Sequence, residues 1–567
     1  MTVNDRSLTV EEAAALLGVS VATVRRKCAS GELPARKLGR SWVVDGQSLP
    51  RPTQQSRPRR VGSASSLVDL GQAITHVSRQ DLRRDVWVPD VLLHEDDLSD
   101  PSVLIVAASD RIDGNAVHDP AVSIPVPKSP FFPRNSINLS LIDRLAYHAV
   151  VAELADLIEK SLSDSVYSAR LSSRDSRLLA NGRDGWLLWR RDITAALSDG
   201  SDYMVSTDVT AYFDFVKHEI LIPEVQQLGV DTRLIAPLRR MLKEWATAPN
   251  TGIPQGPDAS RVLGNFYMAA VDHVMVELAD VRYFRFMDDV RIVGRSRSAV
   301  IEALQVLDQE CRRRGLALST KKTELLVGES AVDSMAEPEL DAAQYAFETK
   351  EDDDDELRKQ LAGLFRKAIK SDGTVRTRWA RFSLSRLFQM RDRSVLSRVL
   401  GSLENLAPLG DLVPKYLHPW MRRPATQRRI TEFLANPERN TSPYLSTWLM
   451  AVMLDIPDAI PDEWVSYARR IALDKAEPSY HRTLAINVLV LGGQARDLEA
   501  VRDIVKLEHD PEVVRAALVA LKRGGGLTRE MTQASKRIAG LQATADYLAS
   551  ASSLPSLVFR SRRNQIH

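Results

Sequence analysis

The stretch that decides the fold is Tyr283–Arg295, which reads YFRFMDDVRIVGR. Two adjacent aspartates, Asp288 and Asp289, stand between two short runs rich in apolar residues. The pattern predicts a strand, a tight turn and a second strand, with both carboxylates at the turn. Carboxylate oxygens are ligands that Mg²⁺ prefers. An acidic turn is common between strands, however, so this segment alone does not establish a site.

Three further segments extend the pattern on both sides of this turn. They are Tyr203–His218 (YMVSTDVTAYFDFVKH), Thr251–Met268 (TGIPQGPDASRVLGNFYM) and Gly315–Leu326 (GLALSTKKTELL). In the first, an apolar strand delivers Asp208, and Phe213 follows five positions later at the start of a helix. In the second, glycine and proline predict a stiff, bent loop whose backbone can approach a nucleotide or template base, followed by a helix. The third places Lys322 on a loop after a helix.

Taken in order, the four segments resemble motifs A, B, C and D of reverse transcriptases. The usual forms are D-x4-F/Y-D, G-x-P-Q-G, x-x-D-D and G-L-x-L-x-x-x-K-T, and the resemblance covers roughly residues 120–330. Any one of the motifs would be weak evidence, but four in the right order are specific. The resemblance implies a fingers–palm fold with an antiparallel sheet, and an RNA-directed DNA polymerase that joins deoxynucleotides. Chance assembly of these segments in an unrelated α/β domain is the competing interpretation.

The resemblance also implies a metal site. Asp208 and Asp288 would be the bridging ligands, Asp289 would assist, and the backbone of Val209 would complete the set. Two Mg²⁺ (or Mn²⁺) ions about 3.5–4 Å apart would activate the primer hydroxyl and hold the triphosphate. Three clustered carboxylates repel one another, so such a site should bind cations readily.

Two further residues receive roles from the resemblance. Phe213 matches the position of a steric gate, where a bulky ring excludes a ribose 2′-hydroxyl and so favours deoxynucleotides; ordinary packing is the alternative. Lys322 is implied as a proton donor or as a stabiliser of the leaving pyrophosphate. The neighbouring Lys321 makes this assignment uncertain by one position, and a plain surface lysine is the alternative.

Residues that bind the incoming nucleotide are expected from two segments. Val126–Val150 resembles the fingers segment that grips the triphosphate, with Lys128 and Arg134 as the matching cations. The match is looser here, because the spacing around the paired prolines departs from the usual pattern. Charge and fork geometry suit lysine and arginine to phosphate. Gln255 and Gly256 of the bent loop complete the expected nucleotide-binding set.

Details of two motifs point to a subgroup. The second motif reads PQGPDASR, and Arg285 and Arg291 flank the aspartates of the third. Both variants resemble the abortive-infection-like, defence-associated reverse transcriptases of bacteria, in which helical repeats replace the thumb. The resemblance implies phage defence and, by analogy only, protein-primed or untemplated synthesis. With two cysteines in the chain, the zinc-finger and endonuclease modules of intron-encoded enzymes are absent.

The N-terminal segment over residues 7–44 forms a separate unit. Thr9 and Glu12 predict a capping box before a first helix, Ser20 predicts the cap of a second, and LPARKLGRSWVV predicts a β-wing. The segment resembles the winged helix-turn-helix of the excisionase and MerR-like family. That resemblance implies DNA contacts from Thr23, Arg25, Arg26, Lys27, Arg36, Lys37 and Arg40. A three-helix adaptor with solvated basic residues is the alternative.

The expected organisation is therefore a multidomain α+β protein. Its parts are a winged helix-turn-helix (residues 1–50), a flexible basic linker (51–85), reverse-transcriptase fingers and palm (86–346) and an all-α helical-repeat domain (347–567). The acidic run EDDDDE near residue 351 predicts a solvated loop or helix start. His509–Gly524 resembles a HEAT repeat, with Asp-Pro opening a helix, although an ordinary helical bundle is nearly as good an interpretation.

Composition narrows the class of protein. Hydrophobic residues make up 44% and charged residues 26% of the 567-residue chain, as in soluble globular proteins. The net charge is only +2, so nucleic-acid binding must come from local basic patches. The start of the chain lacks a signal-peptide pattern, and no run reaches the roughly 18–20 apolar residues of a membrane span. These features predict a cytoplasmic protein without a membrane partner.

The expected partners are nucleic acids and deoxynucleoside triphosphates. DNA would bind the N-terminal unit and RNA or DNA the polymerase, and homo-oligomerisation through the helical region is left open. Two other functions compete with this interpretation. One is a DNA-binding regulator that uses the polymerase fold as a scaffold or sensor, against which the intact aspartates and Phe213 argue. The other is a retron-like or intron-like enzyme with a dedicated RNA.

Overall fold

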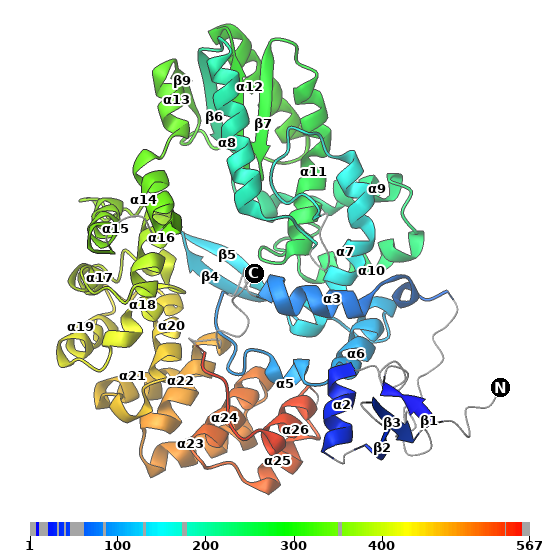
Figure 1. The fold of residues 1–567 in the computed structure, drawn as a ribbon, viewed down its shortest axis with the longest axis vertical. Coiled ribbons are helices and arrows are strands. Elements are labelled where there is room, and N and C mark those ends of the chain that lie inside the picture. Colours follow the sequence, from blue (N-terminus) through cyan, green and yellow to red (C-terminus); the bar gives the residue numbers. More distant parts are fainter. Residues whose placement is uncertain are drawn as a thin grey trace. The chain divides into compact units, whose positions relative to one another are not determined.

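The computed structural model describes residues 7–10, 21–30, 33–38, 41–45, 62–82, 87–128, 132–172, 178–349, 354–538 and 540–557. The chain divides into two compact units, Met1–Ser66 and Leu67–His567 (Figure 1).

The first unit combines one described α-helix with a small antiparallel sheet. Its elements are β1 (Ser7–Thr9), α2 (Val21–Ala29), β2 (Ala35–Leu38) and β3 (Ser41–Asp45). The strand order is β1-β3-β2, and the apolar face of α2 buries Val24 and Cys28 against Val44. The β2–β3 pair confirms the predicted wing. Strand β1 was not predicted, and Glu12 and Ser20 lie outside the described residues.

A four-stranded antiparallel sheet lies in the segment of the second unit that was predicted to be the palm. Its strands are β6 (Tyr203–Asp208), β7 (Val281–Phe286), β8 (Asp289–Gly294) and β9 (Glu324–Val327), in the order β7-β8-β6-β9. The flanking helices are α8 (Gly182–Ser198), α11 (Asp258–Val276), α12 (Arg297–Arg313) and α13 (Glu329–Met335). Phe284 packs with Trp189 of α8, whereas the adjacent Arg285 bonds to α11. Because side chains alternate along a strand, α8 and α11 cover opposite faces of the sheet.

A hairpin and a group of helices lie outside this sheet in the second unit. The hairpin strands are β4 (Val122–Pro127) and β5 (Pro133–Asn138). The helices are α3 (Leu70–His76), the π-helix η2 (Val77–Asp81), α5 (Glu95–Leu98), α6 (Pro101–Asp113), α7 (Leu141–Ser161), α9 (His218–Gln227) and α10 (Thr232–Glu244). The long α7 is largely buried, and α3, α6, α10 and α11 pack around it.

One segment corrects the expected linker. Residues 70–81 were expected to be part of a flexible basic linker over 51–85, but they are helical, and Leu70, Ala73 and Val77 are buried. His76 and Asp81 are also buried, and each forms a hydrogen bond with Asp258, which lies far away in the sequence. The segment is too short and too polar for its apolar pattern alone to predict a buried helix.

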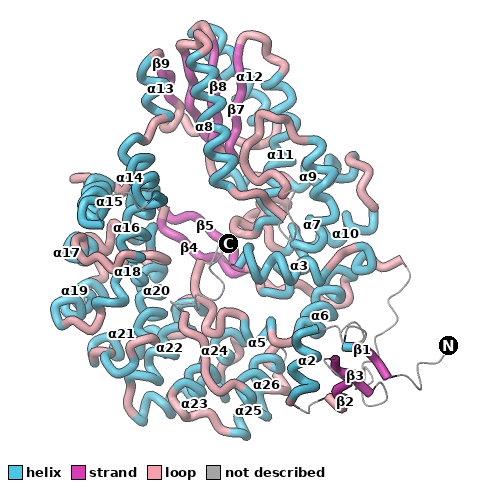
Figure 2. The backbone as a smooth tube through the Cα atoms, viewed as in Figure 1, coloured by secondary structure: helices cyan, strands magenta, loops and turns pink. Residues whose placement is uncertain are grey.

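Every named element from α14 to the C-terminal end of the described chain is a helix, and loops connect these helices (Figure 2). Its α-helices are α14 (Pro338–Thr349), α15 (Asp354–Ala368), α16 (Thr377–Gln389), α17 (Leu396–Gly401), α18 (Val413–Leu417), α19 (Pro424–Ala435), α20 (Pro443–Met453), α21 (Asp462–Leu473), α22 (Ser479–Gly492), α23 (Ala495–Leu507), α24 (Pro511–Arg523), α25 (Arg529–Ser535) and α26 (Gln542–Ser550). One continuous apolar core joins them. The expected boundary at residues 346–347 falls inside α14, so that helix belongs wholly to neither predicted domain.

The predicted start of α24 is confirmed in detail. Asp510 is the N-cap, and its carboxylate accepts a hydrogen bond of 2.9 Å from the Glu512 backbone N–H. Pro511 occupies the first turn, where its missing N–H costs nothing. Helix α22 packs against both α21 and α24.

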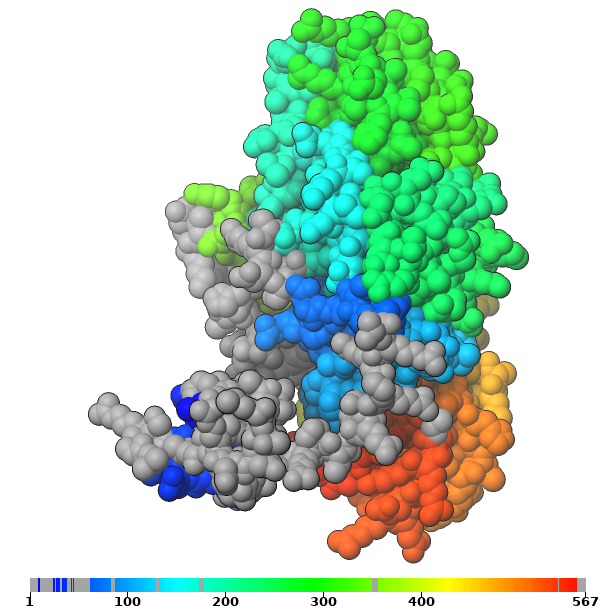
Figure 3. Space-filling view, turned by 90° about the vertical axis from the view of Figure 1, so that its right-hand side faces the viewer, coloured from blue at the N-terminus to red at the C-terminus, as the bar shows by residue number. Residues whose placement is uncertain are grey.

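Within the second unit, the segment before the fingers hairpin connects to the C-terminal helices (Figures 1 and 3). The Arg515 guanidinium of α24 binds both Asp90 and Asp96. The indole N–H of Trp448 donates a hydrogen bond of 3.0 Å to the Trp87 carbonyl. Trp448 also packs with Ile124 of β4, so the helical region and the fingers share a buried apolar cluster.

Candidate active site

The turn between β7 and β8 brings the predicted aspartates together. Met287 and Asp288 form the turn, and Phe286 faces Asp289 across the hairpin, which confirms the predicted strand–turn–strand. Asp289 lies directly opposite Asp208, the last residue of β6. Residues directly opposite on adjacent antiparallel strands have Cβ atoms about 4.5–5.5 Å apart. The three acidic residues of motifs A and C therefore share one end of the palm sheet.

The backbone locks this end of the sheet together. The Val209 N–H donates a hydrogen bond of 2.9 Å to the Asp288 carbonyl, and the Ser319 N–H donates one of 2.9 Å to the Asp208 carbonyl. The second bond attaches the loop that carries Lys322 to the strand that carries Asp208. Val209, expected to supply a backbone ligand, is buried immediately beside the carboxylates.

The carboxylates are poorly solvated and repel one another. Burial raises the pKa of Asp288, and the nearby charge of Asp208 raises it further. Burial also raises the pKa of Asp289, with an added contribution from Asp288. Lys322 opposes both shifts by favouring the ionised carboxylates. The site therefore favours a bound positive charge.

Lys322 meets the carboxylates directly. Its ammonium forms an ion pair with Oδ2 of Asp208. The other oxygen, Oδ1, is buried and has no hydrogen-bond partner among the described residues. A divalent cation would satisfy that oxygen, so the chemistry of the Asp208 carboxylate suits a metal ion. Within the described ranges, no three His, Cys, Asp or Glu side chains already lie close enough together to hold an ion.

The fingers hairpin adds cations to the same place. Arg134 of β5 pairs with Val126 of β4, and the Lys128 N–H closes the hairpin with a hydrogen bond of 3.1 Å to the Phe132 carbonyl. Loss of hydration lowers the pKa of Lys128, and the charges of Lys322 and Arg134 lower it further. Asp288 and Asp208 act in the opposite direction. Asp208 and Asp288 are thus close enough to Lys128 to affect its pKa, and the role of Lys128 in gripping the triphosphate stays a prediction.

Phe213 lies in the 3₁₀ turn η3 (Tyr212–Phe215), where it is half-buried. Its carbonyl accepts a hydrogen bond of 2.9 Å from the Ile253 N–H, which ties motif A to motif B. A Cβ atom added to Gly264 of α11 would lie 3.4 Å from the Phe213 ring. The absence of a side chain at this position lets the ring pack directly on the helix.

The motif B loop is held by residues that the sequence did not single out. The Gln255 carbonyl accepts a hydrogen bond of 3.2 Å from the Ile137 N–H of β5. Gly256 has φ +146°, and a Cβ atom there would lie 2.8 Å from the Trp87 indole nitrogen. Both the backbone conformation and this contact require glycine. Trp87, outside every recognised motif, therefore packs against the expected nucleotide-binding loop.

A buried polar cluster fixes the start of α11, just after this loop. Asp81 accepts a hydrogen bond of 2.7 Å from the Asp258 N–H. The His76 Nδ1 atom accepts one of 3.1 Å from the Leu178 N–H, so its Nε2–H donates to Asp258 over 3.1 Å. His148 stacks on His76 with ring centroids 4.2 Å apart. The only sequence signal for this cluster was the Pro-Asp variant of motif B.

The expected DNA-binding residues lie in the first unit. Arg25 on α2 and Arg36 on β2 are exposed. Lys37 is exposed too, with its ammonium 5.9 Å from the centre of the Trp42 ring. Lys27 is partly buried on α2. The side chains of Thr23 and Arg26, and the whole of Arg40, lie outside what the structure describes.

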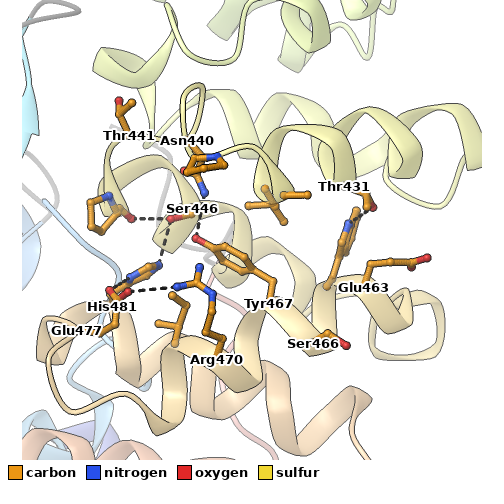
Figure 4. Close-up of a pocket in the computed structure, with 16 residues that line it drawn as sticks. Thr431, Asn440, Thr441, Ser446, Glu463, Ser466, Tyr467, Arg470, Glu477 and His481 are labelled. Carbon is orange, nitrogen blue, oxygen red and sulfur yellow. Dashed lines mark hydrogen bonds and ion pairs between the residues drawn. The ribbon is translucent and has the colours of Figure 1, made fainter.

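A separate cavity of about 670 Å³ lies in the helical region (Figure 4). The Nε2 atom of His481 forms a hydrogen bond of 3.1 Å with the Ser446 hydroxyl, and its Nδ1 atom forms one of 2.9 Å with the Glu477 carboxylate. This order matches a Ser–His–acid triad, but Ser446 is fully buried within α20 and also donates to the Pro443 carbonyl. None of the residues expected at the polymerase site lines this cavity, so the chemistry predicted from the motifs lies elsewhere.

Comparison with protein families identifies two domains. Residues 133–352 match the model described as reverse transcriptase (RNA-dependent DNA polymerase), and residues 7–49 match a helix-turn-helix domain. The first match contains Asp208, Asp288 and Asp289, and the enzyme class of this domain is RNA-directed DNA polymerase. The second supports a DNA-binding part. No curated protein sequence matches the chain.

Solved structures give weaker similarities. Telomerase from Candida albicans, in complex with a fragment of telomeric RNA, aligns at 12% identity and a TM-score of 0.26, over 69% of this chain and 68% of that one. Apo telomerase from Candida tropicalis aligns at 11% identity and a TM-score of 0.27, over 74% and 73%. Such low TM-scores do not bear on fold or function.

Among the described helices, none is both long and apolar enough to cross a membrane.

Proposed function

We propose that the reverse transcriptase domain polymerises deoxynucleotides with two divalent metal ions, Mg²⁺ or Mn²⁺, held by Asp208, Asp288 and Asp289. The observation that carries the proposal is the register that places Asp289 opposite Asp208, with Asp288 on the adjoining turn. The buried, unpartnered Oδ1 of Asp208 supports a cation at this point. When bound, the metal ions would activate the primer hydroxyl and neutralise the triphosphate.

The surrounding side chains would position the nucleotide. Lys128 and Arg134 carry charge suited to the triphosphate, on a hairpin bonded through Ile137 to the Gln255 carbonyl. The Phe213 ring, packed on Gly264, would exclude a 2′-hydroxyl. Lys322 would move from Asp208 toward the leaving pyrophosphate and supply a proton or a positive charge.

Nucleotide incorporation by purified protein tests this function. The assay uses Mg²⁺ or Mn²⁺, labelled dNTPs and separately rNTPs, with an RNA template and with none. The Asp288→Ala, Asp289→Ala double variant should lose incorporation. Asp280→Ala provides the matched control, because Asp280 is an exposed carboxylate just before the same hairpin. Incorporation that persists in the double variant, or is absent from every wild-type lane, contradicts the proposal.

The helix-turn-helix match supports DNA binding by the first unit, and we propose that Arg25 on α2 contacts DNA in the major groove while Arg36 and Lys37 contact the phosphate backbone. A gel shift with the full chain tests this role. Arg36→Ala with Lys37→Ala should weaken binding and lower its salt dependence. If DNA binds while no nucleotide is ever incorporated, the regulator interpretation is favoured over the polymerase.

For the biological role we propose antiphage defence, on the variant motifs B and C and the helical C-terminal region. Template-free incorporation would support untemplated synthesis, and label that stays on denatured protein would support protein priming. Expression in phage-challenged cells tests the role, with the Asp288, Asp289 double variant as control. Equal phage yield with wild type and variant would contradict it, whereas a specific co-purifying RNA would favour a retron-like or intron-like enzyme.

A further inference from the structure

A buried ion pair lies beneath the catalytic turn. Arg285 of β7 donates two hydrogen bonds to Asp272 of α11, at 2.7 and 2.6 Å, and neither side chain has any exposed surface. The hydroxyl of Tyr283 donates a further bond of 2.9 Å to Asp272. Buried ion pairs are often no more stabilising than apolar residues of similar size. Stability therefore does not account by itself for two charges at this place.

The third nitrogen of Arg285 reaches the turn itself. Its Nη1 donates a hydrogen bond of 2.9 Å to the Met287 carbonyl. On the other side, the Met287 N–H donates one of 2.6 Å to the hydroxyl of Ser168. Both polar groups of this residue's backbone are thus fixed. Met287 has φ +59°, a left-handed conformation that a methionine adopts only when its surroundings hold it.

Helix α11 connects the two contacts. The Asn265 amide nitrogen donates a hydrogen bond of 2.6 Å to the Ser168 carbonyl, and its oxygen accepts one of 3.1 Å from Arg285. Asn265 and Asp272 both lie on the helix that follows the Gly256 loop. The element that positions the nucleotide-binding loop thereby also positions the turn.

We propose that Arg285 is a positioning residue for catalysis. Oriented by Asp272, its guanidinium holds the Met287 carbonyl and so sets where Asp288 and Asp289 lie relative to Asp208. This role rests on the proposed polymerase function. Lysine cannot replace arginine here, because a single ammonium does not provide a planar fork that bonds a carboxylate and a carbonyl at once.

The test compares Arg285→Lys with Arg282→Lys. Arg282 lies on the same strand, but its ion pair with Asp199 is exposed, which makes it the matched control. Arg285→Lys should lower kcat for dNTP incorporation about 100-fold and leave the KM for dNTP within about twofold. The reason is that the turn with the aspartates moves, whereas Lys128 and Arg134, which are proposed to bind the triphosphate, keep their positions. Mn²⁺ binding to the nucleotide-free protein, followed by electron paramagnetic resonance, should weaken at least about 10-fold. The control should match wild type in both measurements.

Ser168→Ala guards against a misfolded variant, because it leaves the ion pair intact and removes the opposite contact. Ser168→Ala should also lower kcat and Mn²⁺ affinity, but by smaller factors than Arg285→Lys. Wild-type kcat and Mn²⁺ affinity in folded Arg285→Lys would overturn the proposal, as would a raised KM with unchanged kcat. If Arg285→Lys does not fold, wild-type behaviour of Ser168→Ala overturns it. If wild type incorporates no nucleotide, the polymerase function fails, and Mn²⁺ affinities still decide whether Arg285 positions the carboxylates.

Discussion

Arg515→Met should destabilise the second unit and should do so in a pH-dependent way. The Arg515 guanidinium bonds Asp96 at 2.7 and 2.8 Å and also pairs with Asp90. Only 7% of the arginine side chain and none of the Asp96 side chain is exposed. Methionine would leave the buried Asp96 carboxylate and the partly buried Asp90 carboxylate without the guanidinium that pairs with both. Breaking a buried pair in this way costs about 3–5 kcal/mol at neutral pH.

The pH dependence follows from Asp90. Burial raises its pKa, but Arg515 and His94 more than offset that effect, so the pKa lies well below the usual range. A lowered folded pKa gives stability that is present above the unfolded pKa, near 3.9, and is lost as pH falls below it. In Arg515→Met the folded pKa should instead be raised. The loss in free energy of unfolding relative to wild type should therefore be largest at pH 7 and should become smaller toward pH 4.

Urea unfolding at pH 7, 5.5 and 4, followed by tryptophan fluorescence, measures this deficit. Arg502→Met is the control, because Arg502 pairs with the exposed Glu499 within α23, and such pairs contribute less than about 1 kcal/mol. Adding Asp90→Asn and Asp96→Asn to Arg515→Met should recover part of the loss. A deficit below about 1 kcal/mol at pH 7, or one that does not shrink on acidification, would refute the assigned role of the ion pair.

Three further outcomes are expected. Burial, together with the charge of the neighbouring His76, lowers the pKa of His148 to about 3. Between about pH 6.5 and 3 the unfolded chain therefore binds a proton at this histidine, whereas the folded chain does not. The free energy of unfolding should fall by up to about 1.4 kcal/mol for each unit by which the pH drops in this range. His148→Phe should flatten that slope in denaturant titrations, and an unchanged slope would contradict the shift. Gly256→Ala should cost at least about 2 kcal/mol through its φ of +146° and its clash with Trp87, measured by thermal unfolding; a neutral result would show that the loop adapts. Phe213→Ala should raise rNTP over dNTP incorporation about 10- to 100-fold, and an unaltered ratio would leave packing as the role of the ring.

The sequence by itself determined the hairpin that carries Asp288 and Asp289, the strand that ends at Asp208, the bent loop with its following helix, and the wing of the N-terminal unit. Each of these is encoded locally: apolar runs of strand length flank an acidic turn, and glycine and proline mark the loop. The order of the four motifs indicated the enzyme class, because residue types at fixed spacings can be recognised in the sequence without knowledge of the fold. The further details, including the metal count, the steric gate and the defence role, stay predictions.

Tertiary structure decided what holds the site. Arg285 seemed from the sequence to be a mere neighbour of the aspartates, yet it is fully buried and bonds to a helix residue and to the turn. Residues 70–81 read as a linker, yet they supply His76 and Asp81 to the start of α11. The physical reason is the same in both cases. Burying a polar or charged side chain is costly unless a partner receives it, and those partners come from distant segments that only the folded chain brings together.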